Sequence, residues 1–306
     1  MTAPLSVGDL RGDPRRVRKE AIVRTLFLGA ACLSVVVSAG IVVALVGRAW
    51  SFVTEVDTGS LWGDNWNPRG EEFSIKALMS GTLLVTAIGM AIATPVGMGS
   101  AIYLSEYASP RVRRTLKPIL EVLAGIPSVV LGFFCVSFVS PTIVKNLSSD
   151  AGTFSLVSAG IGVGILTVPL IASVAEDAMR SVPAALREAS YGLGARKITT
   201  SIRVVLPAAV SGLVAAFILA VSRAVGETMV VLLAAGSANR SQFTVNPFEE
   251  GLTMTAAIAS QVRGSDAAVS QVVVDSLYFV GFVLFAVTLL LNVVADRFVR
   301  RVRQAY

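Results

Sequence analysis

Six long uncharged stretches dominate this chain and restrict its folding more than any other feature. They are residues 26–47, 77–105, 122–144, 151–175, 204–222 and 276–295, each 19 to 29 residues long. About 20 apolar residues span a bilayer as a helix, and inside lipid a helix satisfies its own backbone polar groups. We therefore expect an all-α integral membrane protein with six transmembrane helices. The first apolar run is too long for a signal peptide and is expected to be an uncleaved anchor.

The basic residues indicate how the chain is oriented in the membrane. Nineteen Lys and Arg residues lie in segments on one side of the expected spans, namely residues 1–24, 106–117, 176–203 and 297–303, against six on the other side. By the positive-inside rule, both termini and the segment 176–203 face the cytoplasm of a plasma membrane. We expect a cytoplasmic tail over residues 1–24 and one transmembrane domain over 25–306. Because the net charge of +6 follows from this topology, no nucleic-acid partner is expected.

Several absences argue against chemistry on this chain. It contains no His and only two Cys, and both Cys32 and Cys135 lie in apolar runs. A zinc site or a disulfide framework is therefore not expected. No Gly precedes a Lys, so the phosphate-binding loop of nucleotide hydrolases is missing. We expect no cofactor on this chain and no enzyme activity of its own.

A polar segment between the fourth and fifth apolar runs has the pattern of a helical elbow. Pro183 suits the first turn of a helix, and strong helix formers follow it. Gly192 and Gly194 are expected to end this helix, because Gly adopts the left-handed conformation found at helix C-termini. A second helix is expected over residues 197–206 and runs into the fifth span. The product is a short rigid helix at the membrane surface, connected to a span on each side.

The same segment carries a motif with a known resemblance. It reads Glu188-Ala189-Ser190, then Gly194, then Val204-x-Leu206-Pro207. This pattern resembles the EAA motif of type I ABC importer permeases, and differs from it in Ser190 and Val204. The resemblance implies a MetI-like permease fold in residues 25–306 and a coupling loop, residues 176–207, that docks on a separate ATPase holding ATP and magnesium. The residues expected to couple to that ATPase are Glu188, Ala189, Gly194, Leu206 and Pro207.

Two charged residues near the end of the fifth run mark a candidate substrate pathway. Arg223 and Glu227 are four residues apart and would share one face of a continuous helix. Charges at membrane depth are costly unless paired or hydrated, so they often mark a pathway. An Arg fork suits the oxygens of phosphate or carboxylate, and Glu227 would hold that fork when the site is empty. The alternative is a static Arg–Glu pair that only anchors the helix.

Further blocks resemble the phosphate-specific (Pst) ABC permeases. They are Tyr103-Leu-Ser-Glu-Tyr107, Leu123-Ala-Gly-Ile-Pro-Ser-Val-Val130, Arg223-Ala-Val-Gly-Glu-Thr-Met229 and Met254-Thr-Ala-Ala-Ile-Ala259. Of the two permeases in that transporter, PstC and PstA, the chain resembles PstC more. The resemblance implies phosphate import with a PstA-like permease, a PstB-like ATPase dimer, a PstS-like phosphate-binding protein and membrane lipid as partners. An ABC permease for another anion or solute, and an ion-coupled secondary transporter, remain alternatives.

The outer segments carry less information. Trp50, Trp62 and Trp66 are expected to lie at the headgroup level. In the long segment 238–275, the uncharged run 251–262 is too short to span a bilayer. It is expected to form a re-entrant helix or a helix on the membrane surface. Gly160, Gly162 and Gly164 are expected to allow close contact between helices.

Overall fold

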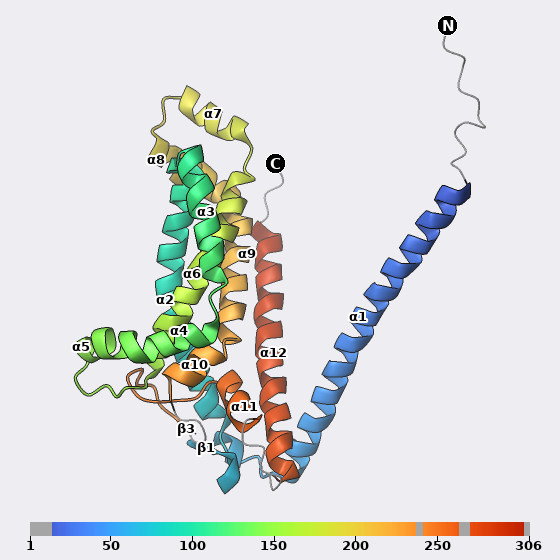
Figure 1. Cartoon of the computed structure of the whole chain (residues 1–306), viewed down its shortest axis with the longest axis vertical. Helices are drawn as coiled ribbons and strands as arrows, with labels where there is room; N and C mark the ends of the chain where they lie inside the picture. Colours follow the sequence, from blue (N-terminus) through green and yellow to red (C-terminus); the bar gives the residue numbers. More distant parts are fainter. Residues whose placement is uncertain (1–13, 237–240, 263–269, 303–306) are drawn as a thin grey trace.

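The computed structural model describes residues 14–236, 241–262 and 270–302, and it is almost entirely helical (Figure 1). Its helical elements are α1 (Pro14–Glu55), η1 (Ser60–Trp62), η2 (Pro68–Gly70), α2 (Ile75–Ile102), η3 (Tyr103–Tyr107), α3 (Pro110–Ala124), α4 (Ser128–Phe134), η4 (Cys135–Val144), α5 (Lys145–Leu147), α6 (Leu156–Arg180), α7 (Ala184–Gly192), α8 (Lys197–Thr200), η5 (Ser201–Val205), α9 (Leu206–Val225), α10 (Met229–Ala234), α11 (Met254–Val262) and α12 (Gln271–Val302). Three short strands, β1 (Asn65–Asn67), β2 (Glu72–Phe73) and β3 (Ser241–Gln242), complete it. We call the two ends of the bundle the α7 end and the sheet end.

Six helical stretches are long and apolar enough to cross a membrane, as the hydropathy pattern predicted. They are Arg18–Glu55, Ile75–Tyr107, Ser128–Leu147, Leu156–Arg180, Lys197–Val225 and Gln271–Arg301. The third and fourth begin later than predicted. Gly125 ends α3 and Pro127 precedes α4, so residues 122–127 are not part of the third span. Ser155 caps α6 by accepting a hydrogen bond from the Ser158 N–H, which sets the start of the fourth.

The first helix is longer than the apolar run that predicted it. α1 begins at Pro14 and continues without a break to Glu55, so residues 14–24 of the expected tail are helical and continuous with the first span. Residues 1–13 lie outside the described part of the chain. Figure 1 shows α1 leaning away from the bundle and meeting α12 near the sheet end. The cytoplasmic placement of residues 1–24 stays a prediction.

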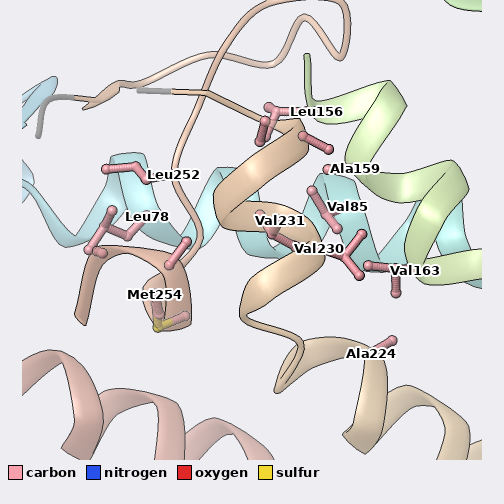
Figure 2. Packing of buried hydrophobic residues seen from close by; sticks show 14 of the residues in the cluster. Leu78, Val85, Leu156, Ala159, Val163, Ala224, Val230, Val231, Leu252 and Met254 are labelled. Atoms are coloured by element: carbon pink, nitrogen blue, oxygen red, sulfur yellow. The ribbon is translucent and has the colours of Figure 1, made fainter. Parts of the chain in front are cut away.

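α2 and α6 form the central pair of the bundle, and glycine brings them together. A Cβ on Gly160 would lie 2.7 Å from the Cβ of Ile88 on α2, and one on Gly164 would lie 3.0 Å from the carbonyl oxygen of Gly89. Only glycine therefore fits this spacing without a shift, which confirms the expected close helix contact. Buried side chains of α2, α6, α9, α10, α11 and the segment before α11 belong to the core that this helix pair helps to build (Figure 2).

A small antiparallel sheet lies at the sheet end of the bundle, opposite α7 (Figure 1). β1 lies between β2 and β3, with Trp66 opposite both Phe73 and Ser241. Trp50 and Trp62 are exposed, but Trp66 is only 1% exposed and its ring lies 6.3 Å from that of Phe73. Trp66 is therefore covered by the chain itself, and its depth in a membrane stays a prediction. It lies on the inward face of β1, where strand pairing to residue 241, far along the chain, buries it.

The uncharged run 251–262 does contain a helix, α11. Leu252, Met254, Ala256 and Ala257 are buried in the main core, and α11 packs against α10, α12 and α2. This packing against the bundle fits the re-entrant alternative better than a helix lying freely on the surface. Residues 238–240 and 263–269 of the same predicted segment lie outside the described part of the chain.

Candidate functional site

The predicted elbow forms at the α7 end of the bundle, where α7 projects beyond the spans (Figure 1). α7 begins directly after Pro183 and ends at Gly192. Gly194 follows with φ +76°, a conformation that favours glycine. Its N–H donates to the Tyr191 carbonyl at 2.9 Å, and the Ala195 N–H donates to the Ser190 carbonyl at 3.1 Å. These bonds close the end of α7 and turn the chain toward α8, as the sequence predicted.

The coupling residues occupy two positions on this elbow. Glu188 and Ala189 are exposed on α7, and Glu188 has no hydrogen bond or ion pair with a described residue. Leu206 and Pro207 open α9 instead, and Leu206 packs against the small core cluster that contains Val205 and Ala209. Glu188 and Ala189 therefore face outward, whereas Leu206 and Pro207 lie at the start of α9. The role in coupling stays a prediction for all five.

Two contacts that the sequence did not indicate hold α7 in place. Ser190 Oγ lies 2.8 Å from Thr200 Oγ1, which ties α7 to α8. Leu186 packs against the same cluster as Leu206. These contacts make α7 part of the bundle and not a loosely attached loop.

The strongest anchor of α7 is an ion pair between Arg187 and Glu106 of η3. Arg187 Nη2 donates to Glu106 Oε1 at 2.9 Å, and Nε donates to Oε2 at 3.4 Å. The same guanidinium donates to the carbonyls of Val182 and Met179, each at 2.8 Å. The Glu106 side chain is only 3% exposed. The Arg187 side chain therefore links α7 to Glu106 at the end of the second span and to Met179 near the end of the fourth.

In the sequence, Glu106 stands out only as part of the Tyr103–Tyr107 block, and Arg187 belongs to no motif position. The two residues are 81 positions apart, so no local pattern relates them. The available signal was a carboxylate at the edge of an apolar run, because buried carboxylates are normally paired.

A second buried carboxylate, Glu176, lies near the end of α6. Arg113 Nε donates to its Oε1 at 2.7 Å, and Lys117 Nζ donates to its Oε2 at 2.8 Å. Lys117 also donates to Asp177. Partial burial by itself would lower the pKa of Lys117, but its hydrogen bonds to Asp177 and Glu176 outweigh that effect and raise the pKa above 10.5.

These cations come from the basic segment 106–117, most of which is helical. Residues 110–124 form α3, with Ser109 as its cap and Pro110 in its first turn. The basic residues of that segment lie on α3, and Arg113 and Lys117 fasten α3 to Glu176 on α6.

The candidate pathway residues do not share one helical face, contrary to expectation. α9 ends at Val225, with Gly226 as its C-terminal cap, and α10 starts at Met229. Glu227 lies in the break, where its Oε1 accepts the Val230 N–H at 3.3 Å and its carbonyl accepts the Thr255 hydroxyl at 2.7 Å. No ion pair joins it to Arg223 in the described chain. Because α9 ends at Val225, the four-residue spacing no longer places the two charges together.

Arg223 is left exposed on the last turn of α9 and makes no hydrogen bond or ion pair with a described residue. The neighbouring Ser222 hydroxyl lies 3.1 Å from the Asn292 side-chain oxygen on α12. An exposed guanidinium at a helix break can bind an oxyanion or a carboxylate of another chain. Among the described residues, no cluster of three or more His, Cys, Asp or Glu is arranged to hold a metal ion. The absence of a cofactor stays a prediction.

Comparison with known proteins relates this architecture to one family. Residues 93–306 match the family described as binding-protein-dependent transport system inner membrane component. The "Phosphate transport system permease protein PstC" of Mesorhizobium japonicum is 31% identical, over 92% of this chain and 90% of its own length. "Phosphate transport system permease protein PstC 1" of Mycobacterium tuberculosis is 32% identical, over 85% and 84%.

Similarity to solved structures concerns the fold. A chain of a bacterial alginate ABC transporter, solved with an alginate pentasaccharide-bound periplasmic protein, superposes with a TM-score of 0.66 at 16% identity, covering 94% of this chain and 97% of that one. A chain of the MetNI methionine ABC transporter in an inward-facing conformation gives 0.57 at 19% identity, over 78% and 100%. These likenesses confirm the expected MetI-like permease fold, and the PstC relatives confirm the resemblance read from the motifs. The chain belongs to the family of binding-protein-dependent transport system inner membrane components.

Proposed function

We propose that this chain is one of two permease subunits of an ATP-driven phosphate importer and couples to a separate ATPase through α7. The observation that carries the proposal is the exposed α7, anchored by Arg187 to the second and fourth spans and joined through Leu206 to the fifth. Phosphate as the substrate rests on the names of the relatives, which are 31% and 32% identical.

In this proposal the α7 end faces the cytoplasm, where the basic segments and both termini lie. Glu188, exposed on α7, meets a groove on a PstB-like ATPase dimer, which holds ATP and magnesium. Movement of the ATPase displaces α7. The Arg187–Glu106 pair passes this displacement to the second span, and Leu206 passes it to α9. This chain contributes no phosphoryl chemistry.

Arg223 is the proposed phosphate contact in the translocation pathway. Its guanidinium is exposed at the helix break and has no partner within the described chain, so a second, PstA-like permease has to close the pathway on that side. A guanidinium fork matches phosphate oxygens. Glu227 lies in the helix break and accepts the Val230 N–H. In this proposal its negative charge keeps phosphate binding in the pathway weak, so that phosphate can leave. At the sheet end, a PstS-like binding protein delivers phosphate.

The experiment is phosphate uptake into proteoliposomes that contain this chain, the second permease and the ATPase, with binding protein added outside. We expect uptake of radiolabelled phosphate that requires ATP inside and is not matched by sulfate. Uptake by this chain without the ATPase would indicate an ion-coupled transporter, and preferential sulfate uptake would indicate another anion. Either result would overturn the proposal.

The coupling role of α7 is tested by Glu188→Lys. Because Glu188 is exposed and unpaired, the variant should insert and fold normally, yet lose ATP-driven uptake and transport-coupled ATPase activity. Glu20→Lys on α1, also an exposed Glu, is the matched control and should behave as wild type. Wild-type uptake by Glu188→Lys would disprove the assignment of α7.

The pathway role is tested by Arg223→Gln. Hydrogen bonds to charged groups contribute about 1.5–3 kcal/mol, so we expect uptake to fall about tenfold to a hundredfold while ATPase docking is kept. Arg223→Lys keeps the charge and loses the fork, so its uptake should be intermediate. Unchanged uptake in both variants would leave Arg223 with a structural role only.

A further inference from the structure

An open pocket of about 460 Å³ lies beside α3 at the α7 end of the bundle. Its walls come from η3, α3 and the last turn of α6. The lining includes four cations, Arg113, Arg114, Lys117 and Arg180, and one carboxylate, Glu121. No part of the proposed coupling or transport mechanism uses this pocket.

The cations of the pocket are not all neutralised within the chain. Glu176 binds Arg113 and Lys117 closely, and Arg180 Nε lies 3.9 Å from it. Arg114 is exposed and makes no hydrogen bond or ion pair with a described residue. Counting Asp177 and Glu121 with Glu176, four cations face three carboxylates, which leaves one positive charge. The fully buried Glu176 fixes the two inner cations. Among the described residues, Arg114 has no partner and the only ion pair of Arg180 is the long one to Glu176, so these two cations are the best placed to contact an anion.

An apolar hollow of about 230 Å³ continues from the pocket along the same helix. It is lined by Pro118, Ile119, Val122 and Leu123, and Pro118 lines both hollows. Val122 is 73% exposed, and Ile119 and Leu123 are also exposed. Along α3, the four cations of this helix all lie in the first half, together with Val112 and Leu116, and the second half is apolar except for Glu121. The order along the helix is therefore cationic, then apolar.

We propose that this surface binds an anionic phospholipid of the leaflet at the α7 end. The phosphate of the headgroup contacts Arg114 and Arg180, and an acyl chain lies against Ile119, Val122 and Leu123. Basic pockets between membrane helices on the cytoplasmic side are known to suit anionic headgroups. Free inorganic phosphate offers the same oxyanion, but it would leave the adjoining apolar hollow without an occupant. Because η3 lines the pocket and carries Glu106, the lipid would also steady the residue that anchors α7.

The proposal needs only a membrane around the chain, and it does not depend on the transported solute. The test is native mass spectrometry of the protein released from nanodiscs of mixed phosphatidylglycerol and phosphatidylcholine. We expect wild type to retain phosphatidylglycerol in preference to phosphatidylcholine. A basic residue near an anionic surface contributes a factor of about five in binding, so Arg114→Ala/Arg180→Ala should retain about thirtyfold less. Lys145→Ala, an exposed cation on α5, should retain as much as wild type.

Two further measurements distinguish the phosphate group of a lipid from free phosphate and test whether the apolar hollow holds an acyl chain. Val122→Asn should lower phosphatidylglycerol retention, because it places an amide where the acyl chain lies. Inorganic phosphate added in excess should not displace the lipid. Displacement by phosphate, with no effect of Val122→Asn, would identify a free-phosphate site and overturn the lipid proposal. Equal retention of phosphatidylglycerol by wild type and the double variant, or loss of the lipid when the ATPase binds, would also overturn it.

Discussion

Replacing Arg187 by Ala should release α7 from the bundle, and the structure gives the size of the effect. The Arg187 side chain is 19% exposed and that of Glu106 only 3%. Removing one partner of a buried ion pair costs about 3–5 kcal/mol, because the other charge stays buried and unpaired. Since Arg187 is partly exposed, we take the lower end, about 3 kcal/mol. With 1.4 kcal/mol per factor of ten, the undocked state of α7 becomes more populated by about a hundredfold.

Hydrogen–deuterium exchange of the α7 amides, measured by mass spectrometry on the detergent-solubilised chain, follows this population directly. We expect protection in α7 to fall by about two orders of magnitude in Arg187→Ala, while α2 and α6 stay protected. Arg196→Ala is the matched control, because Arg196 lies in the same loop and is exposed. Its α7 exchange should equal that of wild type.

A second variant distinguishes the buried charge from the loss of a large side chain. Arg187→Ala/Glu106→Gln removes both charges, so it should restore part of the protection lost in Arg187→Ala. The reasoning fails if Arg187→Ala leaves α7 exchange unchanged. It also fails if the double variant exchanges as fast as Arg187→Ala, because the unpaired carboxylate would then not be the cause.

Two further tests concern the backbone of the elbow and the attachment of α3. Gly194→Ala should destabilise the folded elbow by about 1–2 kcal/mol, because Gly194 has φ +76°, and should reduce stimulation of the ATPase. Gly192→Ala is the control, since the space around its Cβ is equally open, and it should leave both properties unchanged. Equal effects of the two substitutions would refute the backbone argument. The pKa of Lys117 is raised above 10.5 in the folded protein, so its stabilisation of α3 is complete below that pH and is lost as the pH rises through the raised value. Thermal unfolding followed from about pH 9 to about pH 12 should show this loss beginning only above pH 10.5 in wild type and not in Lys117→Arg. The same loss in both would exclude Lys117 as its source.

Local patterns in the sequence were enough to predict the spans and the elbow. Inside lipid each span has to form its own backbone hydrogen bonds, so the length of an uncharged run such as 204–222 decides the element by itself. The turn at Gly194 also depends on neighbouring residues alone, since its hydrogen bonds reach no further than Ser190 and Tyr191. The PstC resemblance rested on similarly short blocks.

The sequence did not predict a residue's surroundings where those depend on distant parts of the chain. Trp66 was expected at the headgroup level and is buried by pairing with a strand near residue 241. The Arg223–Glu227 face required an unbroken helix, but Glu227 turns to cap α10 and its carbonyl binds Thr255 of α11. The pairing with β3 and the contact with Thr255 join residues far apart in the chain, so neither could be predicted from the residues next to Trp66 or Glu227.

The sequence by itself therefore determined six membrane helices, a helical elbow with its exposed Glu188, and membership of a permease family. Only the tertiary structure decided what holds that elbow, because Arg187 and Glu106 are 81 positions apart and meet only when α6 packs on α2. It also decided that Arg113 and Lys117 bind Glu176, which left Arg114 free to bind an anion. Hydropathy and helix capping act over a few residues and can be read along the chain, whereas the partners of buried charges are chosen by packing.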